Sequence, residues 1–237
     1  MRYPLPGGVG VSRLCVYDTV TPDGLPGGTP HIHLCCTEAY VVTGGRGAVQ
    51  TLSGQGFAEH ELSPGALLWF TPGTVHRLVN HGDLEIVVVM SNSGLPESGD
   101  AVLTFPSEVL ADPDRYAVAA ALPGGGAPGT DVTSAYLRRD LAVEGFHNLR
   151  AAVDRHGPRA MREFYDAAVA LKRPLLDQWR TRWEDGAFRA AQSTGVQLDA
   201  LARGDASHLR DARVMAVPRP TEEGRLGMCG LLDTYVP

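Results

Sequence analysis

The sequence predicts an α+β protein with a mainly β amino-terminal half and a helical carboxyl-terminal half. Short apolar runs rich in β-branched residues recur between Gly, Pro, Asn and Asp as far as about residue 105. From Ser134 onward the apolar residues instead recur with a helical period. The segment LPGGGAPGTD lies between the two patterns and is typical of a flexible connection. We therefore expect residues 1–106 to form one domain, residues 107–133 a linker, and residues 134–237 a mainly helical region.

The composition is that of a soluble globular protein and excludes several classes of partner. The chain has 237 residues, of which 43% are hydrophobic and 20% charged, which is enough to bury a sizeable core. Its net charge of −6 argues against a nucleic-acid partner, because no cationic excess is present to neutralise phosphates. No apolar run approaches the ~18 residues of a membrane span.

The cysteines and the amino terminus predict a cytoplasmic location. The four cysteines include the adjacent pair Cys35 and Cys36, and no CxxC motif occurs. A reduced intracellular protein is the simplest interpretation. The opening residues MRYPLPGGVG lack the apolar stretch of a secretory signal.

The amino-terminal half reads as a series of short strands joined by turns. Their even spacing predicts an antiparallel sandwich or barrel. The expected strands are residues 11–20, 31–36, 38–42, 47–52, 57–62, 63–70, 71–79 and 84–90.

The carboxyl-terminal half reads as a series of amphipathic helices. We expect Ser107 to cap a short helix over residues 107–122. A longer helix should run from residue 134 to Gly157, a second should follow it to Pro174, and a third and a weaker fourth should cover residues 176–183 and 196–202. The apolar face of the first comprises Leu137, Leu141, Phe146, Leu149 and Val153. Five arginines are interpreted as a solvated helix face, namely Arg138, Arg139, Arg155, Arg159 and Arg162. Residues 214–217, VMAV, are expected to add a strand to the sheet.

Three histidines and a glutamate have the spacing of a metal site. His31 and His33 lie two residues apart in an expected strand, so their side chains share a face about 6.6 Å apart. Glu38 would fall on the opposite face of a regular strand, so the chain must bend near residues 35–37 for Glu38 to join them. His76 follows a TPG turn and must come from another strand. Three imidazoles and one carboxylate suit Fe(II), Mn(II), Ni(II), Zn(II) or Cu(II).

These residues fall in two motifs that resemble those of the cupin superfamily. The first cupin motif is G-x5-H-x-H-x3–4-E-x6-G, and here His31, His33, Glu38 and Gly45 align while the leading glycine spacing differs. The second motif is G-x5-P-x-G-x2-H-x3-N. Gly65, Gly73, His76 and Asn80 align with it, and Thr71 stands where the family usually has proline. The resemblance covers about a quarter of the chain and implies a small β-barrel of the jelly-roll type with one divalent metal at its centre.

The resemblance implies several functions. The family includes dioxygenases, isomerases, epimerases, cyclases and binding proteins, and the fold does not choose among them. Our first hypothesis is a non-haem Fe(II) dioxygenase acting on a small organic substrate, in which His31, His33, Glu38 and His76 hold the metal. In it, Glu38 either stays bound or is released to act as a catalytic base. The alternatives are a redox-neutral isomerase, epimerase or cyclase, and a non-catalytic binding or sensing protein.

The sequence also gives expectations for several residues around the predicted site and for the oligomeric state. Tyr40 is a candidate substrate contact, and Trp69 and Phe70 are expected to line or wall the barrel. Cys35 and Cys36 are interpreted as small buried hydrophobic residues. His60 and His81 are expected to be exposed and outside the site. Single-barrel cupins are commonly dimeric, so the resemblance also implies a homodimer.

Overall fold

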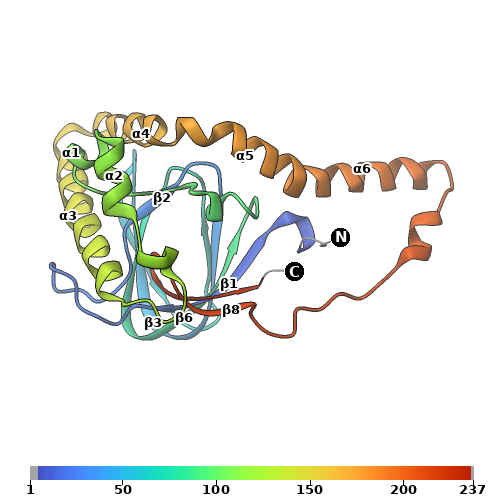
Figure 1. Ribbon diagram of the computed structural model, residues 1–237, viewed down its shortest axis with the longest axis horizontal. Helices are drawn as coiled ribbons and strands as arrows, with labels where there is room; N and C mark the ends of the chain where they lie inside the picture. Colours follow the sequence, from blue (N-terminus) through green and yellow to red (C-terminus); the bar gives the residue numbers. More distant parts are fainter. Residues whose placement is uncertain (1–4, 236–237) are drawn as a thin grey trace.

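Among the residues that the structure describes, a single antiparallel sheet of nine strands forms a β-barrel. The computed structural model describes residues 5–235 (Figure 1). In the described part, the sheet has the order β4-β3-β6-β1-β9-β8, with β2 pairing to β6 and β7 and with β5 pairing to β3. The strands are β1 Gly10–Val16, β2 His31–His33, β3 Glu38–Ser53, β4 Gly56–Leu62, β5 Leu67–Phe70, β6 Val75–Met90, β7 Ala101–Leu103, β8 Glu222–Leu226 and β9 Gly230–Tyr235. The expected barrel with a helical region after it is therefore confirmed.

Two strands are longer than the sequence predicted. Residues 38–42 and 47–52 belong to one strand, β3, and residues 75–79 and 84–90 to another, β6. The glycines between them form bulges in a continuous pairing rather than turns. Gly45 has φ +66°, and a Cβ at this position would lie 2.0 Å from the carbonyl oxygen of Asp83. Glycine at this position allows β3 and β6 to bend together without separating.

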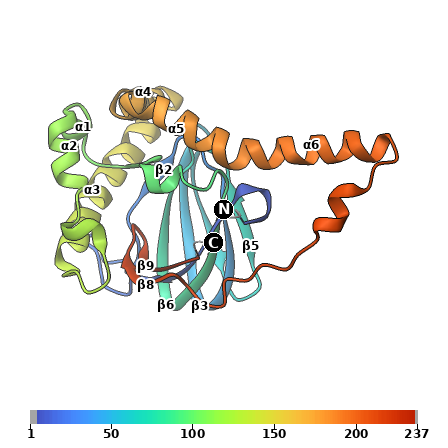
Figure 2. The same ribbon diagram turned by 45° about the vertical axis from the view of Figure 1, so that its right-hand side comes forward.

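Helices cover one side of the barrel and then leave it. The helices are α1 Ser107–Leu110, α2 Pro113–Ala120, α3 Thr133–His156, α4 Pro158–Lys172, α5 Leu176–Trp183 and α6 Arg189–Ala202. In two views, α1 to α4 gather on one side of the sheet while α6 extends away from it (Figures 1 and 2). A π-helical segment, Glu184–Phe188, joins α5 to α6.

The expected helix over residues 107–122 is divided in two, and Ser107 does not cap it. Pro106 occupies the capping position of α1, and no side chain caps this end. The division comes at Pro113, which begins α2. The side chain of Asp112 accepts hydrogen bonds there from the N–H groups of Asp114 and Arg115.

The main core lies between the sheet and α3 and α4. Phe146 and Val153 are buried on α3, whereas Leu137, expected on the same face, is 68% exposed. The first two turns of α3 instead turn Ala135 and Arg139 inward. Arg139 is 1% exposed, so the expectation of a solvated arginine face is wrong for this residue. Its guanidinium donates to the carbonyl oxygens of Thr19 and Gly27, which satisfies its burial.

The end of the chain returns to the barrel by a hairpin that the sequence did not predict. Residues 214–217 form no strand, and Val214 is 97% exposed. Instead β8 pairs with β9, and β9 pairs with β1 from Val11↔Tyr235 to Val16↔Gly230. The sheet is thus completed by residues from both ends of the chain. No helix within residues 5–235 combines the length and apolarity that a membrane crossing requires.

Candidate metal centre

His31, His33, Glu38 and His76 converge on one point inside the barrel. β2 supplies the first two, Glu38 begins β3, and His76 is the second residue of β6. One ligand atom from each side chain lies within 4.8 Å of all the others, and all four residues are buried. His31 pairs with His76 across the β2–β6 ladder, which brings their rings together.

The predicted bend before Glu38 is present and is held by hydrogen bonds. Residues 34–37 leave the sheet between β2 and β3. The carboxylate of Asp100 accepts hydrogen bonds from the N–H groups of Leu34 at 3.2 Å and Cys35 at 2.8 Å. The N–H of Thr37 donates to Ser91 Oγ at 2.9 Å. These contacts replace the strand pairing and turn Glu38 toward the histidines.

Each histidine is oriented by a hydrogen bond at Nδ1. His31 Nδ1 lies 2.8 Å from the carbonyl oxygen of Thr29, and His76 Nδ1 lies 3.1 Å from that of Thr74. Asp100 Oδ2 lies 3.1 Å from His33 Nδ1. Carbonyl oxygens only accept hydrogen bonds, so Nδ1 carries the proton in His31 and His76. The Nε2 lone pairs of these two rings therefore point at the shared centre.

Potential ligand atoms of all four side chains crowd together at the centre. His31 Nε2 and His76 Nε2 lie 3.1 Å apart, and Glu38 Oε2 lies 3.1 Å from His76 Nε2 and 3.2 Å from His33 Nε2. Glu38 Oε2 is buried and has no hydrogen bond of regular geometry among the described residues. Two donors at right angles around an ion about 2.1 Å away are about 3.0 Å apart. The cluster therefore fits one metal ion, which would satisfy all four atoms.

The ionisation states of the cluster suit metal binding. Burial raises the pKa of Glu38, but His76 and His33 outweigh it and hold that pKa well below its usual range. Burial and the neighbouring His76 and His33 lower the pKa of His31 well below the ordinary value. Burial acts to lower the pKa of His33 as well, yet Asp100 and Glu38 raise it to about 9. A carboxylate and a neutral imidazole are thus preformed, and a proton on His33 competes with a metal.

A cavity of about 470 Å³ opens beside the cluster. His31, His33 and Glu38 line it together with apolar residues of β1 and β6. The loop after β6 adds Ser93, Gly94, Pro96 and Glu97 to its wall. The carboxyl-terminal half adds Arg182, Arg225, Met228, Cys229, Leu232, Thr234 and Tyr235. Cys229 is buried, and burial and the charge of Glu38 raise the pKa of its thiol.

The aromatic residues singled out in the sequence lie around the cluster in different ways. Tyr40 is fully buried and is not among the residues that line the cavity, so its contact with substrate stays a prediction. Its hydroxyl has no hydrogen bond of regular geometry, and burial and the charge of Glu38 raise its pKa well above the ordinary value. Phe70 packs behind His76, with 4.2 Å between ring centroids. Trp69 belongs to strand β5 of the barrel wall, and its side chain is 65% exposed, so it does not line the interior.

The cysteines and histidines that were expected to lie outside the site are either buried or exposed as follows. Cys36 is buried as expected, whereas Cys35 is exposed because the bend turns it outward. All four cysteines are free. His60 and His81 are exposed, as expected.

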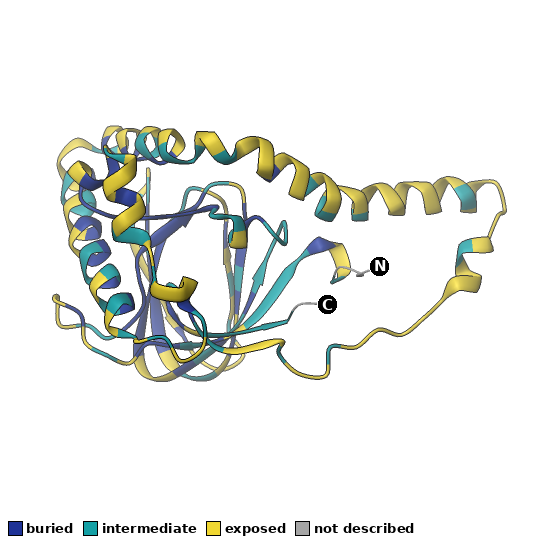
Figure 3. Ribbon diagram, in the orientation of Figure 1, coloured by how far each residue is buried: buried dark blue, intermediate teal, exposed yellow. Residues whose placement is uncertain are grey.

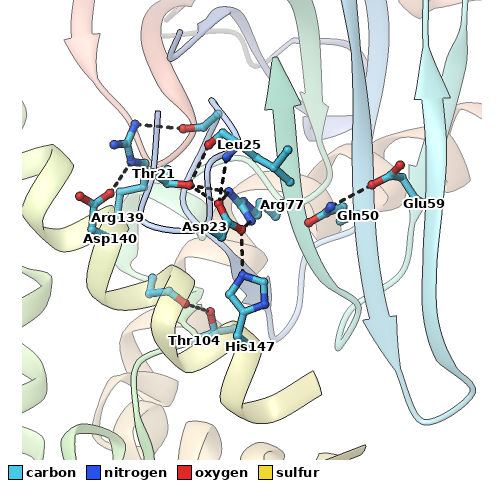
Figure 4. A network of polar contacts seen from close by, with 12 residues as sticks. Thr21, Asp23, Leu25, Gln50, Glu59, Arg77, Thr104, Arg139, Asp140 and His147 are labelled. Carbon is cyan, nitrogen blue, oxygen red and sulfur yellow. Dashed lines mark hydrogen bonds and ion pairs between the residues drawn. The ribbon is translucent and has the colours of Figure 1, made fainter. Parts of the chain in front are cut away.

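A second polar network, which the sequence did not reveal, lies next to His76. Arg77 is fully buried and donates hydrogen bonds to Asp23 and Thr21 in the loop before β2 (Figure 4). Asp23 also contacts His147 Nε2 of α3 at 2.8 Å. The network joins β6, the loop and α3. Alternation along β6 predicts that Arg77 points away from His76, but no sequence pattern pairs it with Asp23.

Comparison with known proteins agrees with the barrel and its site. Residues 18–91 match the family model described as cupin domain. No curated protein matches the chain. Similar solved structures include the capsular polysaccharide assembling protein CapF from Staphylococcus aureus, at 20% identity over 38% of this chain and 25% of that one, with a TM-score of 0.28.

Two enzymes are among the other similar structures. An oxalate oxidase is 25% identical over 35% of this chain and 40% of its own, with a TM-score of 0.28. WlaRA, a TDP-fucose-3,4-ketoisomerase from Campylobacter jejuni, is 12% identical over 33% of this chain and 58% of its own, with a TM-score of 0.29. The chain covers less than two thirds of each of these proteins, and TM-scores this low support no inference about function.

Proposed function

The chain contains a cupin domain, and from that premise we propose that it is a non-haem Fe(II) dioxygenase acting on a small organic substrate. One observation carries the proposal. The buried His31, His33, Glu38 and His76 present four converging donor atoms, including an unsatisfied carboxylate oxygen, at the wall of a cavity. A metal-binding group and a space for substrate therefore adjoin each other.

The donor set supports iron among the possible metals. It consists of imidazole nitrogens and a carboxylate oxygen, without a thiolate. Cys229 lines the cavity but is not one of the four residues whose ligand atoms converge. When bound, Fe(II) would supply electron transfer to O2. The protein residues would orient the metal through the hydrogen bonds of His31, His33 and His76 at Nδ1.

The chemistry of the cavity wall favours oxidation over proton transfer. An isomerase or epimerase needs a base, and commonly an acid, within reach of its substrate. Among the described residues that line the cavity, the carboxylates are Glu38 and Glu97. Glu38 belongs to the metal cluster, and Glu97 accepts a hydrogen bond from the N–H of Gly94. Outside the metal cluster, the described residues of the wall that could transfer a proton are Glu97, Cys229 and Tyr235. This small set suits a reaction in which the metal and O2 do most of the chemistry.

The volume of the cavity is that of a site for a small-molecule substrate. Its volume of about 470 Å³ lies within the ~300–1,000 Å³ of small-molecule sites. Leu14, Val88, Met90, Met228 and Leu232 give much of its wall an apolar character. The substrate would place a polar group toward the metal and an apolar part against this wall.

Metal content and oxygen uptake test the proposal. The protein would be purified without added metal, analysed for bound elements, and then reconstituted anaerobically with Fe(II), Mn(II), Ni(II), Zn(II) or Cu(II) in turn. Glu38→Gln and His76→Ala should each lose the metal, while His81→Ala, an exposed histidine outside the cluster, should keep it. O2 consumption would then be followed with a panel of small organic acids, phenols and thiols.

Each result has a distinct consequence. Near-stoichiometric iron that Glu38→Gln loses, with substrate-dependent O2 uptake, would support the dioxygenase. Stoichiometric zinc or nickel without O2 uptake would favour a redox-neutral isomerase, epimerase or cyclase in which Glu38 serves as the base. No binding of any of these metals would leave a non-catalytic binding protein.

A further inference from the structure

Arg182 is a cation on the cavity wall that no acidic side chain of the described chain neutralises. It lies on α5, is exposed, and lines the same cavity as the buried His31, His33 and Glu38. The acid three residues later, Asp185, pairs instead with Arg189 at 2.6 Å. Within residues 5–235, Arg182 takes part in no hydrogen bond or ion pair. Its charge is therefore available to a ligand at the mouth of the cavity.

The other arginine of the wall already has partners. Arg225 Nη1 lies 2.8 Å from the carboxylate of Glu222, and its Nη2 donates to the carbonyl oxygen of Gly125 at 2.9 Å. These contacts hold Arg225 to its own hairpin and to the loop before α3. Among the described residues of the wall, Arg182 is thus the cation that remains unpaired.

The loop after β6 fixes the position of Arg182. Trp179 of α5 is buried, and its Nε1 donates to the carbonyl oxygen of Ser98 in this loop at 3.0 Å. A Cβ added to Gly94 would lie 3.9 Å from Arg182 Cδ, so the stem of the arginine lies along the loop. The same loop ends at Asp100, which orients an imidazole of the metal cluster. One loop therefore positions both the cation at the mouth and one side of the cluster.

The cavity differs in character between its mouth and its inner end. Figure 3 shows that α5 is largely exposed, whereas the strands of the barrel are mostly buried or half-buried. The exposed Arg182 is thus at the mouth, and the buried metal cluster is at the inner end. Much of the remaining wall is apolar, with Leu14, Val88, Met90 and Leu232. A ligand that fits this cavity has an anionic group, an apolar body and a group that faces the cluster.

The charges at the mouth favour a carboxylate as the anionic group. A guanidinium presents parallel N–H donors that match the two oxygens of a carboxylate. A phosphate dianion would bring more negative charge than one unpaired arginine neutralises. Glu97 also lies on this wall and would repel the excess charge. A monoanion with two oxygens in one plane is therefore the better match for Arg182.

We propose that the substrate is a small carboxylic acid with an apolar body, and that Arg182 binds its carboxylate at the mouth of the cavity. The other end of the molecule then faces His31, His33 and Glu38. The inference rests on the proposed function in one respect, namely that the cavity beside the metal cluster is the substrate site. It assigns specificity to a helix outside the barrel, because α5 supplies the residue that selects the substrate.

Titration calorimetry of the full chain with suberate and octanoate tests the proposal. Both acids have a chain of eight carbons, but suberate carries a carboxylate at each end and octanoate at one end only. In protein loaded with Zn(II), one carboxylate of suberate can face the metal while the other reaches Arg182. Suberate should therefore bind roughly 10-fold more tightly than octanoate, which is the contribution of one hydrogen bond between charged groups.

Three variants connect this difference to Arg182. Arg182→Gln should remove the advantage of suberate, and Arg182→Lys should keep part of it, because lysine retains the charge without the paired donors. Arg180→Gln is the matched control and should keep the full advantage, because Arg180 is an exposed arginine of the same helix that does not line the cavity. Circular dichroism and zinc analysis of every variant would establish that the fold and the metal cluster are intact.

A second titration, with chelator-treated protein, separates this inference from the proposed reaction. Without a metal, the carboxylate of octanoate has Arg182 as its partner, so Arg182→Gln should weaken the binding of octanoate itself by roughly 10-fold. This result would support the role of Arg182 even if the protein held no iron and consumed no O2. Iron binding and O2 uptake with no effect of Arg182→Gln on either acid would instead leave the dioxygenase and overturn the inference.

Three other results would also overturn the proposal. They are equal binding of suberate and octanoate to the zinc-loaded wild type, an advantage of suberate that survives Arg182→Gln, and no measurable binding of either acid. Octyl phosphate provides the last comparison in chelator-treated protein. Tighter binding of this phosphate than of octanoate, lost in Arg182→Gln, would overturn the assignment of a carboxylate.

Discussion

At the scale of single residues, the buried carboxylate of Asp100 organises one side of the candidate metal centre. It is fully buried, contacts His33 Nδ1, and accepts hydrogen bonds from the N–H groups of Leu34 and Cys35. The same side chain therefore orients an imidazole of the candidate metal centre and holds the bend that brings Glu38 close to this imidazole.

Replacing Asp100 with Asn should weaken metal binding by roughly 10–100-fold. An amide oxygen accepts a weaker hydrogen bond from the imidazole than a carboxylate oxygen does. The amide NH2 group would also replace one of the two accepting oxygens, and it cannot accept a hydrogen bond from His33 or from the backbone N–H groups of the bend. Competition with a chromophoric chelator would measure the affinity, with Asp154→Asn on the exposed side of α3 as the control. An unchanged affinity in Asp100→Asn would show that the bend and His33 are positioned without this carboxylate.

The sequence anticipated the four converging side chains but not Asp100. His31, His33, Glu38 and His76 are recognisable because strand alternation and motif spacing are local properties of the chain. Asp100 lies 62 residues beyond Glu38 in the printed sequence, and it reaches His33 because β7 pairs with β2. No local pattern encodes that pairing.

At the scale of elements, helix α3 packs on the backbone after β7 at a glycine. A Cβ added to Gly145 would lie 1.9 Å from the carbonyl oxygen of Thr104 and 2.5 Å from the carbonyl carbon of Phe105. Both are main-chain atoms, so neither can move aside as a flexible side chain would. This close approach fixes the helix against the barrel.

Gly145→Ala should therefore lower the free energy of unfolding by about 2 kcal/mol or more. Overpacking outweighs the helix propensity that alanine would otherwise add. Urea unfolding would measure the change. The neighbouring exposed residue provides the control, since Glu144→Ala should stay within about 0.5 kcal/mol of the wild type. Equal effects at the two positions would contradict the close packing.

The loop before β2 is held by an ion pair whose strength depends on pH. Burial acts to raise the pKa of Asp23, but its hydrogen bonds with Arg77, Thr21 and His147 outweigh this and lower it. A depressed folded-state pKa stabilises the protein fully above the unfolded value of about 3.9 and progressively less as the pH falls below it.

The stability difference between the wild type and Asp23→Asn should follow this pH dependence. It should be constant between about pH 5 and 6 and should shrink as the pH falls from about 4 toward 2. Urea unfolding of chelator-treated protein would measure it without a contribution from metal release. Asp154→Asn should show no such trend, and a pH-independent difference for Asp23→Asn would refute the role given to the ion pair.

At the scale of the whole molecule, metal binding should stabilise the fold because the four donors come from three separate strands. A metal at about 100 times its Kd stabilises the native state by about 2.7 kcal/mol. For a chain of this size, that corresponds to a rise in Tm of roughly 5–10 °C. Thermal unfolding with excess metal and with chelator would measure it. Glu38→Gln should lose most of the shift, and an equal shift in that variant would point to binding elsewhere.

The sequence by itself determined the barrel fold of the amino-terminal half, the helical region after it and the four residues of the candidate metal centre, but not the full length of β3 and β6, strand β7 or the division of the helix at Pro113. These follow from local periodicity, from turn residues and from the cupin-like spacing around His31 and His76. Only the tertiary structure decided that β8 and β9 complete the barrel, that Asp100 supports His33, and that α6 stands free. Each of these depends on pairing or packing between segments far apart in the chain. Such long-range contacts are not encoded by any local, periodic pattern of residues, so the sequence alone does not predict them.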